Sequence, residues 1–213
     1  MSHCRKRRLW PAPVVAGAVT LVAASTAAAL TITGTDAPER IVGSRQADGI
    51  VAKGGGDRIL ALAGADGIDA GDGDDRVHAG AGDDQVAAGN GNDHVRGNRG
   101  ADTIDAGAGF DRVRAGLGDD VVKGGEGFDV LRGGLGRDSV SGGLGNDRVF
   151  ASARRDVVGD TVSGDEGDDR LFTLDGVADH VNCGPGFDRA RVDQHDVVAA
   201  DCERVRLRWR PRG

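Results

Sequence analysis

An aspartate recurs at every ninth residue through most of this 213-residue chain, and that period restricts the chain to a repeat architecture. From Gly55 to Gly145 a glycine precedes each aspartate by two positions, and an aliphatic residue follows each by two. The phase holds without a slip over one run of aspartates: Asp48, Asp57, Asp66, Asp75, Asp84, Asp93, Asp102, Asp111, Asp120, Asp129, Asp138 and Asp147. Because so short a unit cannot bury its own apolar residue, successive units must stack into a solenoid.

The other fixed letters of the unit indicate a turn followed by a strand. Paired glycines accept positive φ and so permit tight turns. Triplets such as Arg76-Val77-His78 alternate polar, apolar and polar residues, which is the pattern of a short strand with one buried side. The aliphatic residues of stacked units are therefore expected to form a thin core.

The repeated aspartates indicate a bound cation. Equivalent residues of stacked strands lie about 4.8 Å apart, and carboxylates at that spacing repel each other strongly. Lys and Arg are rare in the turn positions, where Arg99 and Arg137 are exceptions. A hard divalent cation explains the pattern better, and Ca²⁺ accepts carboxylates together with backbone carbonyls.

Units such as GGEGFDVLR, GGLGRDSVS and GGLGNDRVF closely resemble the G-G-x-G-x-D-x-U-x nonapeptide of the repeats-in-toxin (RTX) calcium-binding proteins. The resemblance covers 34–150 continuously and 155–192 more loosely. It implies an all-β fold, a right-handed parallel β-roll (a β-solenoid) with two nonapeptides per turn. In that fold G-G-x-G-x-D forms the loop, x-U-x forms the strand, and Ca²⁺ lies between loops of adjacent turns.

The resemblance further implies which residues bind the several Ca²⁺ ions. Units two apart face each other across adjacent turns, so Asp138 is expected to share an ion with Asp120 and not with Asp147. The expected ligands are Asp75, Asp84, Asp93, Asp102, Asp111, Asp120, Asp129, Asp138 and Asp147, with the carbonyls of Gly125, Gly127, Gly134, Gly136, Gly143 and Gly145. Weaker sites are expected at Asp57, Asp66, Asp169 and Asp188, and departures such as Asn98, or Ala in the first position, weaken the pattern.

The N-terminus has the features of a secretory leader. The basic run RKRR precedes an apolar stretch that ends in small residues, which indicates a signal peptide over 1–30 or, as an alternative, an uncleaved anchor. We therefore expect a secreted, extracellular protein that does not contact a membrane after cleavage, or a cell-surface protein if the leader stays. Cys183 and Cys202 would then be the remaining cysteines, and an even count in an exported chain indicates one disulfide.

Beyond the core repeats at 70–150 the phase slips by four residues, and the units become irregular. We expect degenerate repeats at 31–69, and degenerate repeats with a disulfide-pinned C-terminal cap at 151–213. The tail alternates arginine with apolar residues, so a strand there would place Val205, Leu207 and Trp209 on one face.

Charge and motifs exclude other function classes. A formal net charge of −7 argues against nucleic acid as a partner. No G-x-S-x-G or H-E-x-x-H motif occurs, and His78 and His94 occupy strand positions expected to face solvent, so we expect no enzyme. The sequence predicts an exported calcium-binding β-roll whose folding is driven by Ca²⁺. The alternative is an adhesion module that contacts a cell wall, a polysaccharide or a protein.

Overall fold

The computed structural model describes residues 20–22, 29–152 and 156–208. Most of the predicted leader, its cleavage region and Trp209 lie outside the described residues. The described part of the chain contains no helix long and apolar enough to cross a membrane.

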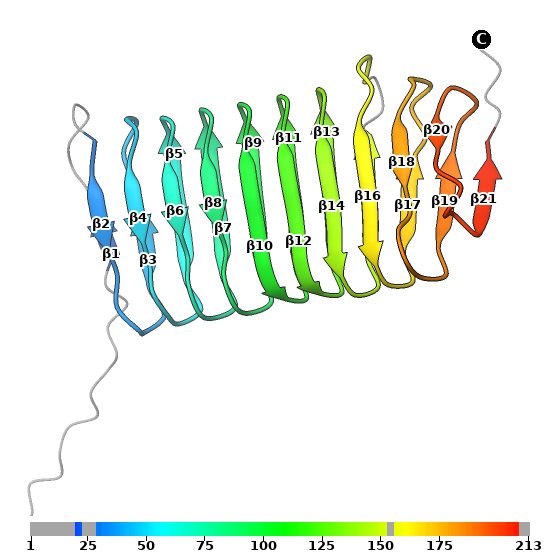
Figure 1. The fold of residues 1–213 in the computed structure, drawn as a ribbon. Helices are drawn as coiled ribbons and strands as arrows, with labels where there is room; N and C mark the ends of the chain where they lie inside the picture. Colours follow the sequence, from blue (N-terminus) through cyan, green and yellow to red (C-terminus); the bar gives the residue numbers. More distant parts are fainter. Residues whose placement is uncertain (1–19, 23–28, 153–155, 209–213) are drawn as a thin grey trace, which may run out of the picture.

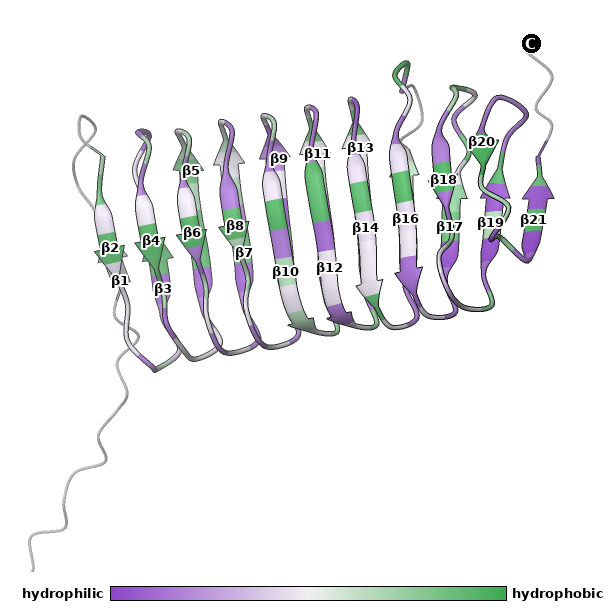
Figure 2. Cartoon of the chain, in the orientation of Figure 1, coloured by the Kyte–Doolittle hydropathy of each residue, from purple (hydrophilic) through white to green (hydrophobic). Residues whose placement is uncertain are grey.

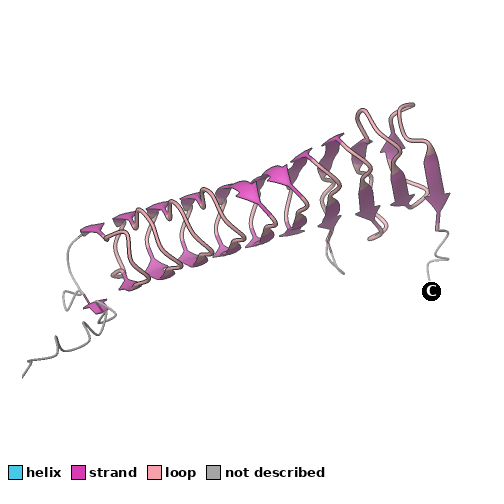
Figure 3. Cartoon of the chain, turned by 90° about the horizontal axis from the view of Figure 1, so that it is seen from below, coloured by secondary structure: helices cyan, strands magenta, loops and turns pink. Residues whose placement is uncertain are grey.

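The chain coils into two parallel sheets that face each other, and loops join them at every half turn (Figures 1 and 3). The odd sheet has eleven strands: β1 (Thr20–Val22), β3 (Arg40–Val42), β5 (Arg58–Ala63), β7 (Arg76–Ala81), β9 (His94–Arg99), β11 (Arg112–Leu117), β13 (Val130–Leu135), β15 (Arg148–Ser152), β17 (Arg170–Thr173), β19 (Arg189–Val192) and β21 (Arg204–Leu207). The even sheet has ten: β2 (Thr31–Thr33), β4 (Gly49–Val51), β6 (Gly67–Asp69), β8 (Gln85–Ala87), β10 (Thr103–Gly109), β12 (Val121–Gly127), β14 (Ser139–Leu144), β16 (Thr161–Glu166), β18 (His180–Asn182) and β20 (Val197–Val198). This confirms the expected all-β β-roll.

Each turn of the roll contains two nonapeptides, because strands pair with the strand two units later. Val113 of β11 pairs with Leu131 of β13, for example. Where the phase slips after Phe150, the pairing distance grows, and Ser139 of β14 pairs with Thr161 of β16. The extra residues are therefore accommodated within one turn, and the stacking continues beyond them.

The core is as thin as the sequence indicates. The aliphatic residue of each unit is buried, as Val77 and Leu131 show with no exposed surface. The first-position alanines point into the same core and are fully buried: Ala70, Ala79, Ala88, Ala106 and Ala115. These alanines, treated above as departures, thus add apolar area where glycine adds none.

Many strands are longer than the expected three residues. β7 runs from Arg76 to Ala81 and β10 from Thr103 to Gly109, so both include the G-G-x part of the next unit. The expected boundary was wrong because these residues also pair in register with the next turn, as Gly80 does with Asn98. The turn itself is reduced to the residues just before the aspartate.

Backbone conformation explains the glycines at the second position. Gly80 has φ of 130°, and a Cβ there would collide with the carbonyl of Leu62 one turn earlier. At two of the positions where the second glycine is replaced, φ stays positive: Asn98 has 81° and Leu62 has 88°. Asparagine tolerates this region, whereas leucine is strained in it.

Replacing Leu62 by Gly is expected to raise the free energy of unfolding by about 1 kcal/mol, because it removes this strain. Chemical denaturation in saturating Ca²⁺ measures the change. The matched control is Leu117→Gly, since Leu117 is also exposed but has no positive φ. The control is expected to destabilise the protein, and equal effects of the two changes would contradict the strain at Leu62.

The tail forms β21, which pairs with β19. Val205 continues the inner column beside Ala190, and Leu207 does so beside Val192, as predicted. Both remain exposed, at 44% and 70%, because β21 is the last strand of the odd sheet.

Candidate metal centre

The turns that precede the strands carry two ladders of buried acidic side chains. In each ladder the backbone N–H of one aspartate donates to Oδ1 of the aspartate one turn later. Asp120 donates to Asp138 at 3.0 Å, and Asp138 donates to Asp160 at 2.8 Å. Asp138 is thus hydrogen-bonded to the acidic residues one turn away on either side, and the sharing of an ion between Asp138 and Asp120 stays a prediction.

The ladders extend over nearly the whole roll. The odd ladder precedes the odd strands and contains Glu39, Asp57, Asp75, Asp93, Asp111, Asp129, Asp147, Asp169, Asp188 and Glu203. The even ladder contains Asp48, Asp66, Asp84, Asp102, Asp120, Asp138, Asp160, Asp179 and Asp196. The four aspartates expected to form weaker sites occupy the same positions as the others.

In most members of the ladders the second carboxyl oxygen has no partner in the described structure. The unpaired, buried Oδ2 atoms belong to Asp57, Asp66, Asp75, Asp84, Asp93, Asp102, Asp111, Asp120, Asp129, Asp138, Asp147, Asp160, Asp169, Asp179 and Asp188. Each of these side chains is at most 2% exposed. A buried carboxylate oxygen without a partner is costly. A column of such oxygens fits Ca²⁺, which prefers several oxygen ligands.

The same burial favours the protonated carboxyl when no cation is bound. The pKa of Asp138 is raised to about 8, mainly by burial and also by the charges of Asp120, Asp160 and Asp156, against the lowering effect of the hydrogen bond from the Asp120 backbone. Burial likewise raises the pKa of Asp75 to about 7. Asp75 and Asp138 therefore favour either a proton or a cation over a bare charge.

The carbonyl oxygens of the glycine turns lie against the glycines of the next turn along the roll. A Cβ added to Gly145 would collide with the Gly127 carbonyl oxygen, and one added to Gly136 with that of Gly118. Glycine is required at these positions because loops one turn apart approach so closely. The turns that carry the expected carbonyl ligands thus stack directly on one another.

Asp160 and Asp179 continue the repeat series beyond the phase slip but were not among the expected ligands, and both are members of the even ladder. Both lie beyond the phase slip, but each is followed two positions later by a buried valine, Val162 or Val181. That local Asp-x-Val signal was sufficient to find them.

A second acidic group, also missed, lies beside the even ladder. One carboxylate oxygen from each of Asp156, Asp160 and Asp175 lies within 4.8 Å of the others. Asp175, like Asp160, has a buried Oδ2 without a partner. Asp156 lies nine residues after Asp147, in the phase of the repeats, but the even ladder continues through Asp160 instead. Asp175 lies outside the phase, so no repeat signal indicates it. Three carboxylates at this spacing could hold a cation.

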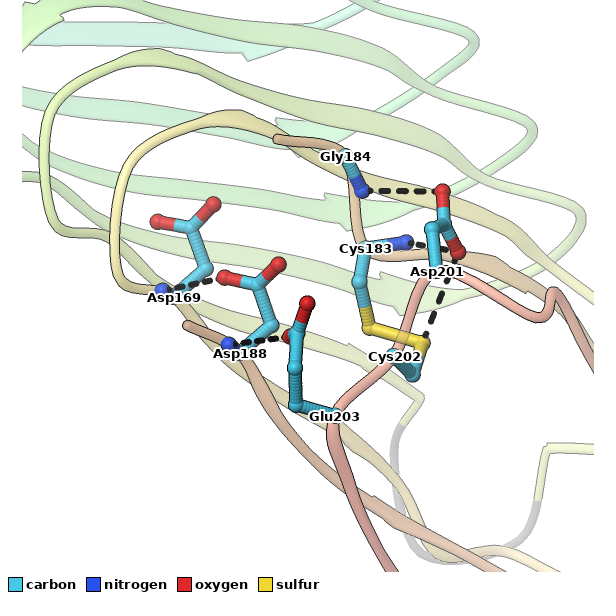
Figure 4. The surroundings of a disulfide bond; sticks show 7 residues. All are labelled: Asp169, Cys183, Gly184, Asp188, Asp201, Cys202 and Glu203. Atoms are coloured by element: carbon cyan, nitrogen blue, oxygen red, sulfur yellow. Dashed lines mark hydrogen bonds between the residues drawn. A yellow bond between two sulfur atoms is a disulfide. The ribbon is translucent and has the colours of Figure 1, made fainter. Parts of the chain in front are cut away.

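The predicted disulfide between Cys183 and Cys202 is present (Figure 4). Cys183 occupies a first position and is fully buried. Beside the bond, Asp201 accepts hydrogen bonds from the backbone N–H groups of Cys183 and Gly184, and Glu203 accepts one from Asp188 at 2.8 Å. The disulfide therefore holds the segment that ends the odd ladder.

Removing this disulfide is expected to lower the free energy of unfolding by about 3 kcal/mol, because the crosslink restricts the unfolded chain. Thermal unfolding in Ca²⁺, with and without a thiol reductant, measures the loss. The double variant Cys183→Ala/Cys202→Ala serves as the control, since reductant should not change its unfolding temperature. No loss on reduction of the native chain would contradict a stabilising role.

Comparison with known families agrees with this geometry. The model of the RTX calcium-binding nonapeptide repeat, four copies long, matches residues 51–86, 78–113, 87–122, 114–149 and 159–177. No curated protein matches the chain. The matched segments span more than half of the 213 residues and include most turns of the two ladders. With its β-roll and its buried aspartate ladders, the chain belongs to the RTX calcium-binding nonapeptide repeat family, whose repeats bind Ca²⁺.

Proposed function

We propose that this protein is exported and that Ca²⁺ binding between adjacent turns drives its folding into the β-roll. The observation that carries the proposal is the column of buried Oδ2 atoms without partners. The ions bind to these atoms. Asp138 shares one ion with Asp120 and another with Asp160. The ligands are the ladder aspartates together with turn carbonyls, such as those of Gly127 and Gly136.

Ion binding and folding are thermodynamically linked in this roll. The stacked carboxylates exist only in the folded chain, so the free energy of ion binding adds to the free energy of folding. The core offers little compensation, since it consists of one aliphatic row per sheet and small first-position residues. Without Ca²⁺ at neutral pH, the chain is largely disordered.

Export gives this linkage a use. The basic run and apolar stretch of the leader support secretion, and extracellular modules bind Ca²⁺ at about 10⁻⁴–10⁻³ M. The chain stays unfolded inside the cell and folds where calcium is plentiful. The roll itself catalyses no reaction, in keeping with a family that is generally calcium-binding and structural.

Circular dichroism during a Ca²⁺ titration of the chelated full chain tests the folding step. β-sheet signal is expected to appear with Ca²⁺ and much less with Mg²⁺, which demands a stricter octahedral geometry. A β-sheet signal present without Ca²⁺ and unchanged by it would overturn the proposal.

Fractionation of an expressing culture tests export separately. The full chain is expected outside the cytoplasm, and replacing Arg5, Lys6, Arg7 and Arg8 with Gln is expected to retain it inside. Equal distribution of the two chains would contradict a secretory leader.

A further inference from the structure

The outer face of the odd sheet carries two columns of arginine, which we call the arginine face. In the first column, the opening residue of most strands is arginine and the strands pair in register: Arg40, Arg58, Arg76, Arg112, Arg148, Arg170, Arg189 and Arg204. The second column, two residues later, contains Arg96, Arg114, Arg132, Arg191 and Arg206. All of these side chains are exposed.

The even sheet has no such face. Its corresponding outward residues are mostly small or neutral, such as Thr103, Ser139 and Ser141, and Figure 2 shows β14 as almost entirely pale or green. Conversely, no strand of the odd sheet contains Asp or Glu within the described residues. The charges of an acidic protein are therefore segregated, with the cations on one sheet.

No arginine of this face forms an ion pair with a carboxylate within the described residues. The one ion pair among the described residues is His195–Asp193, far along the chain from the middle of this face. Like charges one strand apart, at about 4.8 Å, destabilise a sheet.

We propose that the arginine face binds a linear anionic polysaccharide lying along the axis of the roll. Guanidinium groups pair with carboxylates in a bidentate geometry, and a regular column of them matches a polymer with regularly spaced anions. A hollow between β9, β11 and β13 is lined by His94, Arg96, Arg112, Arg114 and Arg132. This inference rests on the proposed function, because the columns exist only in the folded roll and Ca²⁺ offsets the buried negative charge.

Two other polyanions fit less well. An anionic membrane is planar and would also meet the exposed acids of the flanking turns, such as Asp74 and Asp119. Single-stranded nucleic acid needs free aromatic faces on which its bases stack. Here Phe150 and Phe172 cover each other with ring centroids 4.6 Å apart, and Arg132 and Arg191 cover their outer faces. Phe110, at 63% exposed, offers one ring and not the row of rings that successive bases need.

Binding of the Ca²⁺-loaded full chain to hyaluronan, a linear polysaccharide with regularly spaced carboxylates, tests the proposal. The variant Arg96→Gln/Arg112→Gln/Arg114→Gln is expected to lose at least about tenfold in affinity, and added salt is expected to weaken native binding. The matched control, Lys53→Gln/Lys123→Gln/Arg137→Gln, removes the same charge away from the face and is expected to bind almost as the native chain does.

The possible outcomes distinguish this proposal from its alternatives. Equal losses in variant and control, or equal binding to neutral dextran, would overturn the proposal. So would tighter binding to single-stranded DNA or to vesicles containing phosphatidylserine. Circular dichroism in Ca²⁺ verifies that each variant folds. If the first variant does not fold, Arg148→Gln/Arg170→Gln/Arg189→Gln gives a second test for loss of binding. If Ca²⁺ folds the native chain and hyaluronan does not bind, this inference fails and the proposed function stands.

Discussion

Replacing Asp138 by Asn is expected to have opposite effects with and without Ca²⁺. Asparagine keeps an oxygen that accepts the Asp120 N–H, a bond of 3.0 Å in the native chain. It removes the charge that faces Asp120, Asp160 and Asp156. Without Ca²⁺ the variant therefore folds more readily, whereas with Ca²⁺ it has lost a charged ligand from two adjacent ion sites.

Two titrations measure these effects. In chelator at pH 8, an osmolyte such as TMAO promotes folding, and Asp138→Asn is expected to fold at a lower concentration than the native chain. In a Ca²⁺ titration its folding midpoint is expected to rise about tenfold, since an interaction with a charged group contributes about 1.5–3 kcal/mol.

Matched variants separate charge from hydrogen bonding. Asp138→Ala removes the acceptor as well, leaves the Asp120 N–H unpaired, and is expected to destabilise the protein in both conditions. Asp105→Asn removes the same charge from an exposed, outward position of β10 and is expected to change little. If Asp138→Asn behaved as Asp138→Ala does in chelator, repulsion among the ladder carboxylates would not limit folding of the calcium-free chain.

The nine-residue period predicted a solenoid, and the resemblance to the RTX nonapeptide predicted the β-roll with two units per turn and hence the neighbours within the ladders. Every unit must form the same turn and fill the same core position, so glycine, aspartate and valine recur in phase. The unit that contains Gly136, Asp138 and Val140 is an example. Stacking by two units then fixes Asp120 as the neighbour of Asp138. The disulfide followed from an even cysteine count.

The arginine face was not predicted, although its signal is in the sequence. Outward positions are free of the turn and core demands, and units alternate between two sheets, so the relevant period is twice that of the aspartates. Arg40, Arg58 and Arg76 follow this longer period. The net charge of the chain gave no indication of the arginine face, because many of the acidic residues that make the net charge negative are buried in the ladders.

The group of Asp156, Asp160 and Asp175 could not be predicted for a different reason. Its members come from loops of irregular length beyond the phase slip. Their proximity depends on how the extra residues fit within one turn, and no fixed spacing records that. Strand lengths were also wrong, since pairing of the G-G-x residues depends on the neighbouring turn.

Without Ca²⁺, the roll is expected to be far more stable at pH 5 than at pH 8. Burial raises the pKa of ladder aspartates above the ordinary value of 3.8, to about 6 for Asp102, about 7 for Asp111 and about 8 for Asp179. The folded chain therefore binds more protons than the unfolded chain. Stability from these groups is fully present below about pH 4 and is lost as pH rises through 6 to 8.

Because many carboxyls shift together, the chelated chain is expected to pass from mostly folded to mostly unfolded over this range. Circular dichroism between pH 4 and 9 after chelation and desalting measures the transition. Ca²⁺ binding has the opposite dependence, since protons compete with the ion: the affinity of the folded chain for Ca²⁺ is expected to rise as pH rises from 5 to 8. The double variant Asp120→Asn/Asp138→Asn provides the control, with a shallower dependence in both experiments. If the chelated chain instead became more stable as pH rises, the ladder carboxyls could not be buried and protonated in the folded state. Protons and Ca²⁺ would then not compete for the same buried oxygens.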